Sequence, residues 1–448
     1  MTSGNRSSEP IYYKDEEAIE GLRGIADYFL VNDRKIYIRS DDSVTSFLGR
    51  KECVIRRSRG YVPVPIDLSS AFCSVKPILN PVPSILACGS ELKNTFCLTK
   101  GTKAFLSHHI GDLENLETLM SFETGIEHFK KIFSLVPNAV AFDKHPDYFS
   151  TPYTDSISSL KKFPIQHHHA HIASCMAENN IAKKVIGIAF DGTGYGDDGK
   201  IWGGEFFIGD YAKFERWAHF EYIPLPGSEI GIKEPWRMAV SYLIQAFGNN
   251  SFPHSLPFLN KIDPQKVSLV MQQIDKEINT PLTSSVGRLF DAVSSLAGLC
   301  NVIEYEGQAA IRLEKEANEK GTCLYPYEII TKEFGYQIRI LQMIRAIAKD
   351  VSQGAEISHI AGAFHRTVAS IILDVSRLIR EECGLHDVVL SGGVFQNRLL
   401  LGMTIAYLEK DGFKAYSHSK VPTNDGGISL GQAAITLHKL TEMRCTYE

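Results

Sequence analysis

Two histidines four positions apart are the residues of this sequence best suited to holding a metal ion. His167 and His171 lie in residues 166–173, which continue into an apolar stretch typical of a buried helix. Residues four apart share one helical face, so both imidazoles can point at one ion. A chance run of packed histidines is the alternative, but neutral imidazoles are costly to bury without partners.

Three short glycine-rich segments come next in chemical interest, because each follows a strand-like run or begins a predicted helix. Bare backbone N–H groups at such points cradle phosphate, and an aspartate among them can hold a metal. Two aspartate-led segments in separate halves of the chain predict two lobes with a nucleotide between them. The segments are Asp191-Gly192-Thr193-Gly194, Ser391-Gly392-Gly393 and Asn424-Asp425-Gly426-Gly427.

Composition limits the class of protein that can carry these residues. The chain has 448 residues, 44% hydrophobic and 22% charged, which suits a globular protein of two or three domains at ~150 residues each. A net charge of −5 argues against nucleic acid as a partner. No apolar run approaches the ~20 residues of a membrane span, and the N-terminus has no signal core. Nine scattered cysteines without a CxxC pair predict reduced thiols in the cytoplasm.

The first 70 residues form a small charged segment. Apolar spacing predicts a helix over residues 17–30, and alternation predicts a strand over residues 35–39. The basic cluster at residues 55–60 is either a solvated loop or an oxyanion site, since arginine forks match phosphate. About 70 residues are marginal for an independent core. This segment is therefore expected to dock on the rest or to belong to something larger.

Strands and helices that would position the chemistry follow in the remainder of the chain. A hairpin over residues 84–98 carries Lys93 at a polar tip that either touches phosphate or is a plain exposed turn. The run 185–190 predicts a strand that ends in the Asp191 loop. Residues 221–285 are rich in proline and are expected to be an insertion to which the pattern assigns no role.

Ten motifs in order resemble the HypF family of carbamoyltransferases, which act in [NiFe]-hydrogenase maturation. Each motif is of moderate specificity, and together they are highly specific over residues 84–440. They include Gln-His-His-His-Ala-His, Phe-Asp-Gly-Thr-Gly-Tyr-Gly and Ser-Gly-Gly-Val-Phe-Gln-Asn. The ten are residues 90–96, 108–113, 145–148, 166–171, 190–196, 234–239, 287–293, 305–310, 391–397 and 424–433.

The resemblance implies an α/β protein with a two-lobed fold of the actin and sugar-kinase (ASKHA) type, similar to TsaD proteins. Residues 84–440 would be this TsaD-like domain, with two ribonuclease-H-like lobes. Residues 1–70 resemble the closing part of a YrdC-like domain, through Met1 to Asn5, residues 41–44 and the basic cluster. The family's acylphosphatase domain, its CxxC zinc fingers and most of its YrdC-like domain have no counterpart in this sequence.

The site residues implied by the resemblance are carried over position by position. His167, His171 and Asp425 match metal ligands, and Asp191 matches a carboxylate ligand of related O-carbamoyltransferases; these four are the expected catalytic residues. Asp291 resembles the ribose-binding aspartate. The remaining expected nucleotide contacts are Lys93, Gly192, Gly194, Gly307, Gly392, Gly393 and Asn397.

The activity implied is transfer of a carbamoyl group from carbamoyl-adenylate, which the family makes from carbamoyl phosphate and ATP, to the C-terminal cysteine of HypE. Two histidines with one or two aspartates suit Fe or Zn, and Mg would accompany ATP. The adenylation step is expected to be incomplete in this sequence alone. Two alternatives are an O-carbamoyltransferase acting on a small hydroxylated substrate and a non-catalytic remnant that binds nucleotide or HypE. A sugar or acetate kinase is disfavoured because it does not need the histidine pair.

Overall fold

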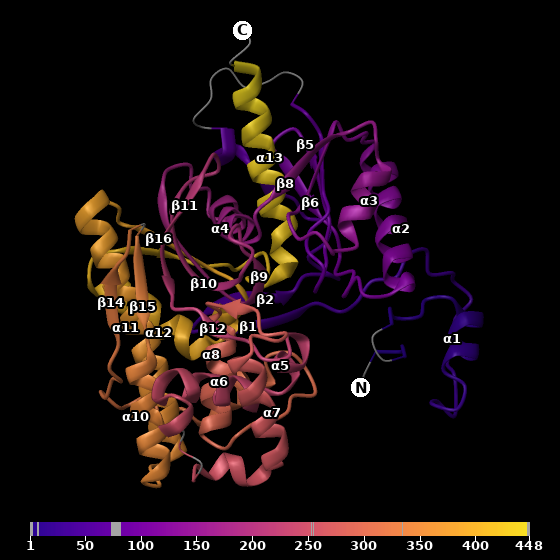
Figure 1. Cartoon of the computed structure of the whole chain (residues 1–448). Helices are drawn as coiled ribbons and strands as arrows, with labels where there is room; N and C mark the ends of the chain where they lie inside the picture. Colours follow the sequence, from indigo (N-terminus) through magenta and orange to yellow (C-terminus); the bar gives the residue numbers. More distant parts are fainter. Residues whose placement is uncertain are drawn as a thin grey trace. The chain divides into compact units, whose positions relative to one another are not determined.

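The chain divides into two compact units in the structure, which is a computed structural model (Figure 1). It describes residues 3–6, 9–72, 82–251, 253, 255–333 and 335–445, so Met1 and Thr2 of the predicted N-terminal motif lie outside the described residues. Unit 1 comprises Met1–Lys183, Asp210–Lys213 and Ser417–Glu448. Unit 2 comprises Lys184–Gly209 and Phe214–Tyr416.

Unit 1 is built on a six-stranded sheet of order β3-β6-β5-β4-β7-β8. The strands β4, β5 and β6 pair antiparallel, while β7 and β8 extend the sheet in parallel from β4. The central strands are buried and apolar, which is typical of a sheet covered on both faces. The strands are β3 (Ile66–Asp67), β4 (Ile85–Ala87), β5 (Cys97–Lys100), β6 (Lys103–Leu106), β7 (Ala139–Asp143) and β8 (Lys161–Ile165).

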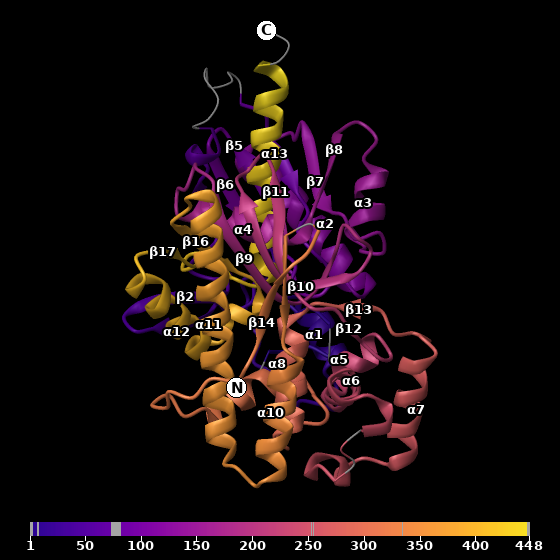
Figure 2. The ribbon, with the colours of Figure 1, turned by 60° about the vertical axis from the view of Figure 1, so that its left-hand side comes forward.

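Helices cover the sheet of unit 1, and one of them, α4, carries His167 and His171. The C-terminal helix α13 packs on α4 (Figure 2). It also packs on β4. Phe122 and Phe129 of α2 pack edge-to-face against Phe96 in the core on the side of α2. The helices are α2 (Leu116–Phe133), α3 (Ser150–Ser156), α4 (His167–Glu178) and α13 (Ile428–Cys445), with the 3₁₀ turns η1 (Ser69–Phe72) and η5 (Asp425–Gly427).

Five strands of unit 2, in the order β11-β10-β9-β16-β17, repeat the order and directions of β6-β5-β4-β7-β8 in unit 1. The principal path of unit 2 is β14-β15-β11-β10-β9-β16-β17, in which β9, β10 and β11 pair antiparallel and β16 and β17 follow in parallel. The predicted pair of α/β lobes is thus seen as two sheets that share a five-stranded topology. The strands are β9 (Val185–Tyr195), β10 (Ile201–Gly209), β11 (Phe214–Phe220), β12 (Ile223–Pro224), β13 (Leu282–Thr283), β14 (Glu328–Thr331), β15 (Tyr336–Arg339), β16 (Asp387–Ser391) and β17 (Lys414–Tyr416).

A large helical set lies between β11 and β16 in the sequence of unit 2. The predicted insertion 221–285 contains α5 to α7, and α6 packs on α8 beside them. The helices are α5 (Glu229–Lys233), α6 (Pro235–Phe247), α7 (Pro264–Asp275), α8 (Val286–Leu296), α9 (Gln308–Glu316), α10 (Leu341–Ser352), α11 (Ile357–Cys383) and α12 (Arg398–Lys410), with 3₁₀ turns η2 (Asn249–Ser251), η3 (Pro257–Lys261) and η4 (Gly393–Gln396).

Three local predictions were wrong. The Asp191 segment is not a loop, because β9 continues through it and pairs with β10, with Gly194 opposite Trp202. The helix predicted over 17–30 is only α1 (Asp15–Gly21), and residues 35–39 form no strand. α1 buries none of its residues, and short helices and lone strands need tertiary packing to persist.

The hairpin of β1 (Val44–Leu48) and β2 (Lys51–Arg56) forms a separate two-stranded sheet in the N-terminal segment. Among the helices of the described ranges, none combines the length and apolar character needed to span a bilayer. All seven cysteines for which a state is described are free thiols, in keeping with the predicted lack of a disulfide framework.

Candidate functional site

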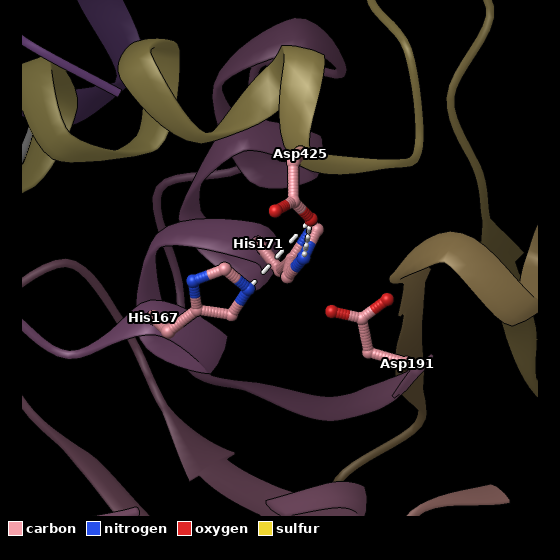
Figure 3. A group of neighbouring side chains, drawn as sticks. All are labelled: His167, His171, Asp191 and Asp425. Carbon is pink, nitrogen blue, oxygen red and sulfur yellow. Dashed lines mark ion pairs between the residues drawn. The ribbon is translucent and has the colours of Figure 1, made fainter. Parts of the chain in front are cut away.

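Three of the predicted metal ligands converge in unit 1 (Figure 3). His167 and His171 are one turn apart on α4, and both are almost completely buried. Their Nε2 atoms lie 3.7 Å and 3.5 Å from Oδ1 of Asp425. The candidate ligand atoms of these three residues all lie within 4.8 Å of one another. Two imidazoles and a carboxylate at this spacing are a suitable donor set for Zn(II) or Fe(II).

Asp143 orients the first histidine and was missed by the sequence analysis. Its Oδ2 lies 2.7 Å from Nδ1 of His167, so the ring N–H on this side donates to the carboxylate. The other nitrogen, Nε2, then carries the lone pair toward Asp425. Asp143 is the last residue of β7, and an acidic residue at a strand's carboxyl end was the available signal.

Asp425 is held at the start of α13 by short-range hydrogen bonds. Ser90 Oγ donates to Asp425 Oδ2 at 3.0 Å. The side chain of Asn424 accepts from Gly426 N at 3.0 Å and so shapes the η5 turn. Gly431 lies so close to α4 that a Cβ atom there would be 1.8 Å from the carbonyl of Ala170. The glycine thus lets α13 bring Asp425 against the histidine helix.

A second buried carboxylate, Glu178 at the end of α4, fixes the loop that leads to Asp425. It accepts hydrogen bonds from Nδ1 of His418 at 2.9 Å and from the backbone N–H groups of Ser419 and Lys420, both at 2.6 Å. Burial opposes ionisation of this carboxyl, but these donors outweigh it and lower the pKa of Glu178 to about 2. The same helix therefore carries two candidate ligands at its start and, at its end, the carboxylate that holds the loop.

The two other histidines of the run have separate roles. His169 Nε2 lies 3.1 Å from the carbonyl of Asp210, to which it donates, and burial lowers the pKa of His169 to about 3. His168 Nδ1 lies 3.3 Å from the side-chain nitrogen of Gln166. Gln166 also caps α4 by accepting from His169 N at 2.9 Å. Spacing alone left open whether these two imidazoles reach the metal, and in the structure neither belongs to the converging set.

Asp191 and the Gly392-Gly393 turn come together within unit 2. Gly393 N donates to Oδ1 of Asp191 at 3.0 Å. Gly392 has φ +105°, and a Cβ atom there would lie 2.2 Å from the carbonyl of Phe190. A glycine is required at this position by conformation and by close packing, apart from any ligand.

The start of α8 is tied to the same strand of unit 2. Ser285 Oγ lies 2.7 Å from the carbonyl oxygens of both Asp191 and Gly192, and it accepts from Arg288 N at 3.1 Å. Asp291, one turn further on, is buried and ion-paired with Arg288 at 2.9 Å. Burial raises the pKa of Asp291 to about 6, and the Arg288 charge opposes that shift.

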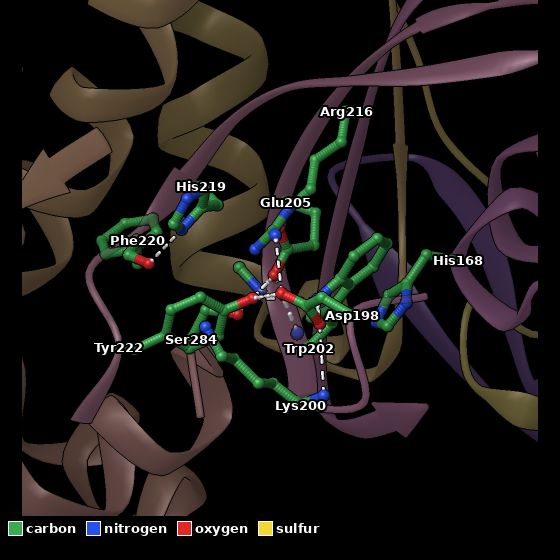
Figure 4. Close-up of polar contacts among 12 residues, drawn as sticks. His168, Asp198, Lys200, Trp202, Glu205, Arg216, His219, Phe220, Tyr222 and Ser284 are labelled. Carbon is green, nitrogen blue, oxygen red and sulfur yellow. Dashed lines mark hydrogen bonds and ion pairs between the residues drawn. The ribbon is translucent and has the colours of Figure 1, made fainter. Parts of the chain in front are cut away.

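A buried polar network supports this region from β10 (Figure 4). Glu205 is completely buried and accepts from Nε of Arg216 at 2.5 Å and from the Ser284 hydroxyl. The Arg216 guanidinium lies 4.2 Å from the ring of Trp202, whose Nε1 donates to Asp198 at 2.8 Å. Because Ser284 precedes the cap of α8, the network fixes that helix start relative to β10.

The other predicted nucleotide contacts are spread over both units. Asn397 caps α12 by accepting from Leu400 N at 2.8 Å, and its amide nitrogen lies 2.9 Å from Nε2 of His365. Gly307 has φ +75° and precedes α9. Lys93, in unit 1, has φ +48°, and its backbone N donates to Asp112 at 2.7 Å.

The basic cluster of the N-terminal segment is solvated only in part, because Arg56 and Arg59 are exposed while Arg57 is not. Arg57 is buried, and its Nη2 donates to the carbonyl groups of Tyr61 at 2.9 Å and Val64 at 2.6 Å. Burial lowers the pKa of this guanidinium to about 10. A pocket of about 570 Å³ in unit 1 is lined by Arg57, Lys51 and Lys420 among other residues. The oxyanion alternative for this cluster stays a prediction.

Comparison with protein families shows to which family the chain belongs. A model described as the second subdomain of the Kae1-like domain of carbamoyltransferases matches residues 187–432, and the HypF Kae1-like domain matches residues 80–178. The chain belongs to the HypF carbamoyltransferase family. The Sua5, YciO and YrdC family, described as telomere recombination, matches residues 1–58, so the family's Kae1-like domains follow the tail of a YrdC-like domain. This confirms the predicted ASKHA-type fold.

Individual relatives agree with this assignment. A carbamoyltransferase HypF of Synechocystis is 37% identical over 96% of this chain and 56% of its own length. A HypF homologue of Cupriavidus necator is 32% identical over 80% of this chain and 92% of its own length. A crystal structure of full-length HypF, in a phosphate- and nucleotide-bound form, matches with TM-score 0.90 and 48% identity over 98% of this chain and 67% of that one. The chain spans about half the length of the longer curated relatives.

Proposed function

We propose that this chain transfers a carbamoyl group from carbamoyl-adenylate to the C-terminal cysteine thiol of a HypE-like acceptor protein, as one step of hydrogenase maturation. The observation that carries the proposal is the convergence of His167, His171 and Asp425, with Asp143 setting the ring orientation of His167. Family membership supports the carbamoyl chemistry. The family's nucleotide-bound relative supports an adenylate as donor.

In the proposed reaction the acceptor sulfur attacks the carbamoyl carbon. A carbon–sulfur bond forms, the carbon–oxygen bond to the adenylate phosphate breaks, and AMP and the thiol proton leave. A divalent ion held by His167, His171 and Asp425 would supply Lewis acidity toward the carbamoyl or phosphate oxygens. We retain Asp191 as a proposed further ligand on the strength of the family resemblance, and Fe or Zn as the proposed metal.

The chain's own residues have defined tasks in this proposal. Asp143 keeps His167 in the tautomer that presents Nε2, and Ser90 orients the Asp425 carboxylate. Asp291 is proposed to contact the ribose. The proposed adenylate contacts are Lys93, Gly192, Gly194, Gly307, Gly392, Gly393 and Asn397. Carbamoyl phosphate, ATP and Mg are proposed to belong to the preceding adenylation step.

The test adds the carbamoyl donor directly and detects carbamoylation of the acceptor protein. Purified metal-loaded chain is mixed with carbamoyl-adenylate and a HypE protein, and mass spectrometry of the HypE C-terminal peptide detects one added carbamoyl group. We expect modification with the wild-type chain and none with His171→Ala. An unmodified cysteine, under conditions in which a full-length relative modifies it, would contradict the proposal. Carbamoylation of a sugar-like alcohol without HypE would instead favour the O-carbamoyltransferase alternative.

A further inference from the structure

His365 is a buried imidazole in the long helix α11 of unit 2, and the proposed reaction gives it no task. Its side chain is completely buried, and α11 packs on α12 (Figure 2). The ring centroids of Phe290 and Phe364 lie 5.2 Å and 5.9 Å from that of His365. Burial disfavours a charged ring and lowers the pKa of His365 to about 4. The imidazole is therefore neutral near pH 7, with one N–H and one lone pair.

The two ring nitrogens have different partners, and these partners determine where the hydrogen lies. Nδ1 is 2.7 Å from the carbonyl oxygen of Ala361, one turn earlier on α11. A carbonyl oxygen can only accept, so Nδ1 carries the hydrogen and donates it. Nε2 then carries the lone pair, and it lies 2.9 Å from the amide nitrogen of Asn397. The Asn397 amide therefore donates to His365.

The Asn397 amide is also held through its oxygen, because Oδ1 accepts from Leu400 N at 2.8 Å. A flipped amide would place its oxygen against the lone pair of His365 Nε2 and its nitrogen against the N–H of Leu400. Neither pair could form a hydrogen bond, so the two neighbours fix one orientation of the amide. The amide nitrogen has two N–H groups, of which His365 takes one, so the orientation of the second is fixed as well.

The same residue stands at the end of the segment that begins with the Gly392-Gly393 turn. The 3₁₀ turn η4 leads directly into Asn397, whose backbone N donates to the carbonyl of Val394 at 3.1 Å. At the start of this segment Gly393 N donates to Asp191 at 3.0 Å. The segment is thus attached to Asp191 at its start and, through the Asn397 side chain, to His365 at its end.

We propose that His365 is a positioning residue for nucleotide binding, because it fixes the Asn397 amide in the orientation that presents its second N–H to a hydrogen-bond acceptor of the adenylate. The inference rests on the proposed function, in which Asn397 contacts the adenylate, and it extends that site by one buried residue. His365 itself makes no contact with the nucleotide and takes no part in proton transfer. Its effect on binding passes through Asn397.

The test measures AMP affinity by titration calorimetry, together with thermal unfolding and metal content of the same preparations. His365→Leu removes the acceptor and should weaken AMP binding by about tenfold, the size of one hydrogen bond. His365→Gln returns an acceptor oxygen to this position and should recover most of the affinity. Metal content should be unchanged in both variants, because the proposed ligands on α4 and at the start of α13 lie in unit 1.

Ser376→Ala is the matched control on the same helix. Ser376 is also completely buried, and its hydroxyl donates to the carbonyl of Ile372, one turn earlier, at 2.7 Å. The variant loses a hydrogen bond within α11 that does not involve Asn397, so it should bind AMP as the wild type does. A loss of affinity equal to that of His365→Leu would assign the effect to the stability of α11 and overturn the proposal.

Asn397→Ser tests whether His365 acts through Asn397. A serine can still cap α12 but has no amide N–H, so AMP binding should weaken. Adding His365→Leu to Asn397→Ser should cause no further loss, because the two residues act as a unit. Losses that multiply, an unchanged affinity in Asn397→Ser, or equal AMP binding by the wild type and His365→Leu would overturn this inference alone. A wild-type chain that binds no AMP would contradict the adenylate part of the proposed function, and this inference with it.

Discussion

The proposed metal site of unit 1 and the region of unit 2 around Asp191, Gly392 and Gly393 are constructed in different ways. In unit 1 the groups that converge are side chains, and two of them are oriented by other side chains: His167 by Asp143 and Asp425 by Ser90. In unit 2 the groups that converge are largely backbone: Gly393 N holds the Asp191 carboxylate, and Ser285 holds backbone carbonyl oxygens.

Because of this difference, the two regions differ in whether a substitution can affect function without affecting folding. A ligand in unit 1 can be removed while the helix that carries it remains capped and packed. In unit 2 the glycines fit against neighbouring backbone, so a side chain at Gly392 would disturb the fold and the site together. Single substitutions of side chains should therefore separate metal binding from nucleotide binding.

Acid should affect the two units in opposite directions. Glu178 has a pKa of about 2, below its unfolded value, so its stabilisation is present above about pH 4.5 and is lost as pH falls toward 2. The amount lost is about 3 kcal/mol. The pKa of Asp291 is raised to about 6, so its burial penalty applies as pH rises through 6 and is relieved by acid. Hydrogen exchange at pH 3 should therefore open residues 418–421 before α8.

Glu178→Gln supplies the variant for the acid experiment. An amide keeps one acceptor oxygen but loses the charge, so the variant should be less stable at pH 7 and should show a weaker acid dependence between pH 5 and 2. Chemical denaturation as a function of pH measures both. An acid dependence identical to that of the wild type would contradict the role assigned to Glu178.

His171→Ala should lower metal affinity by more than about 100-fold, because it removes a ligand rather than an outer partner of a ligand. Nucleotide affinity should be unchanged, since the proposed ribose contact is Asp291 on α8. Metal analysis after dialysis against a chelator series gives the affinity. His169→Ala is the control on the same helix, because His169 contacts a backbone carbonyl and should leave metal content unaltered.

Asp291→Ala should weaken adenine-nucleotide binding by about 10- to 100-fold, the effect of losing a hydrogen bond to a charged group. Metal content should remain that of the wild type. Titration calorimetry with AMP measures the change. The substitution also leaves Arg288 without its ion pair, so Asp291→Ala/Arg288→Met is the control. Full recovery of affinity in the double variant would assign the loss to the unpaired arginine and not to a ribose contact.

Asp143→Asn should reduce metal affinity by about tenfold, the lower end of the range for partners behind a ligating histidine. The amide oxygen can still accept from His167 Nδ1, so the ring stays oriented while its nitrogen becomes less basic. Competition with a fluorescent chelator resolves a change of this size. Unchanged affinity would show that the Asp143 charge does not tune the site.

The sequence predicted the unit 1 site better than its surroundings. Histidines four apart on a helix define their own geometry, so His167 and His171 could be paired without a structure. Asp143 could not, because its partner lies 24 positions away and depends on how β7 meets α4. The strand character of residues 191–195 was missed because glycine-rich segments favour turns locally, and only pairing with β10 overrides that preference.

In the N-terminal segment the sequence predicted more regular structure than is observed. Apolar spacing predicted a helix over residues 17–30, yet helical spacing indicates a helix only where a core receives the apolar face. Here Tyr28 and Leu30 meet no core within the described chain. The expectation that this segment docks or belongs to something larger rested on its length, which is marginal for an independent core.

The most direct test of the account is metal analysis combined with nucleotide titration on the wild-type chain and on His167→Ala/His171→Ala. The account predicts one Fe or Zn per wild-type chain, none in the variant, and equal AMP affinity in both. Metal retained by the variant would contradict the assignment of the unit 1 site. Metal and AMP binding lost together would contradict the prediction that AMP binds through its own contacts without the metal.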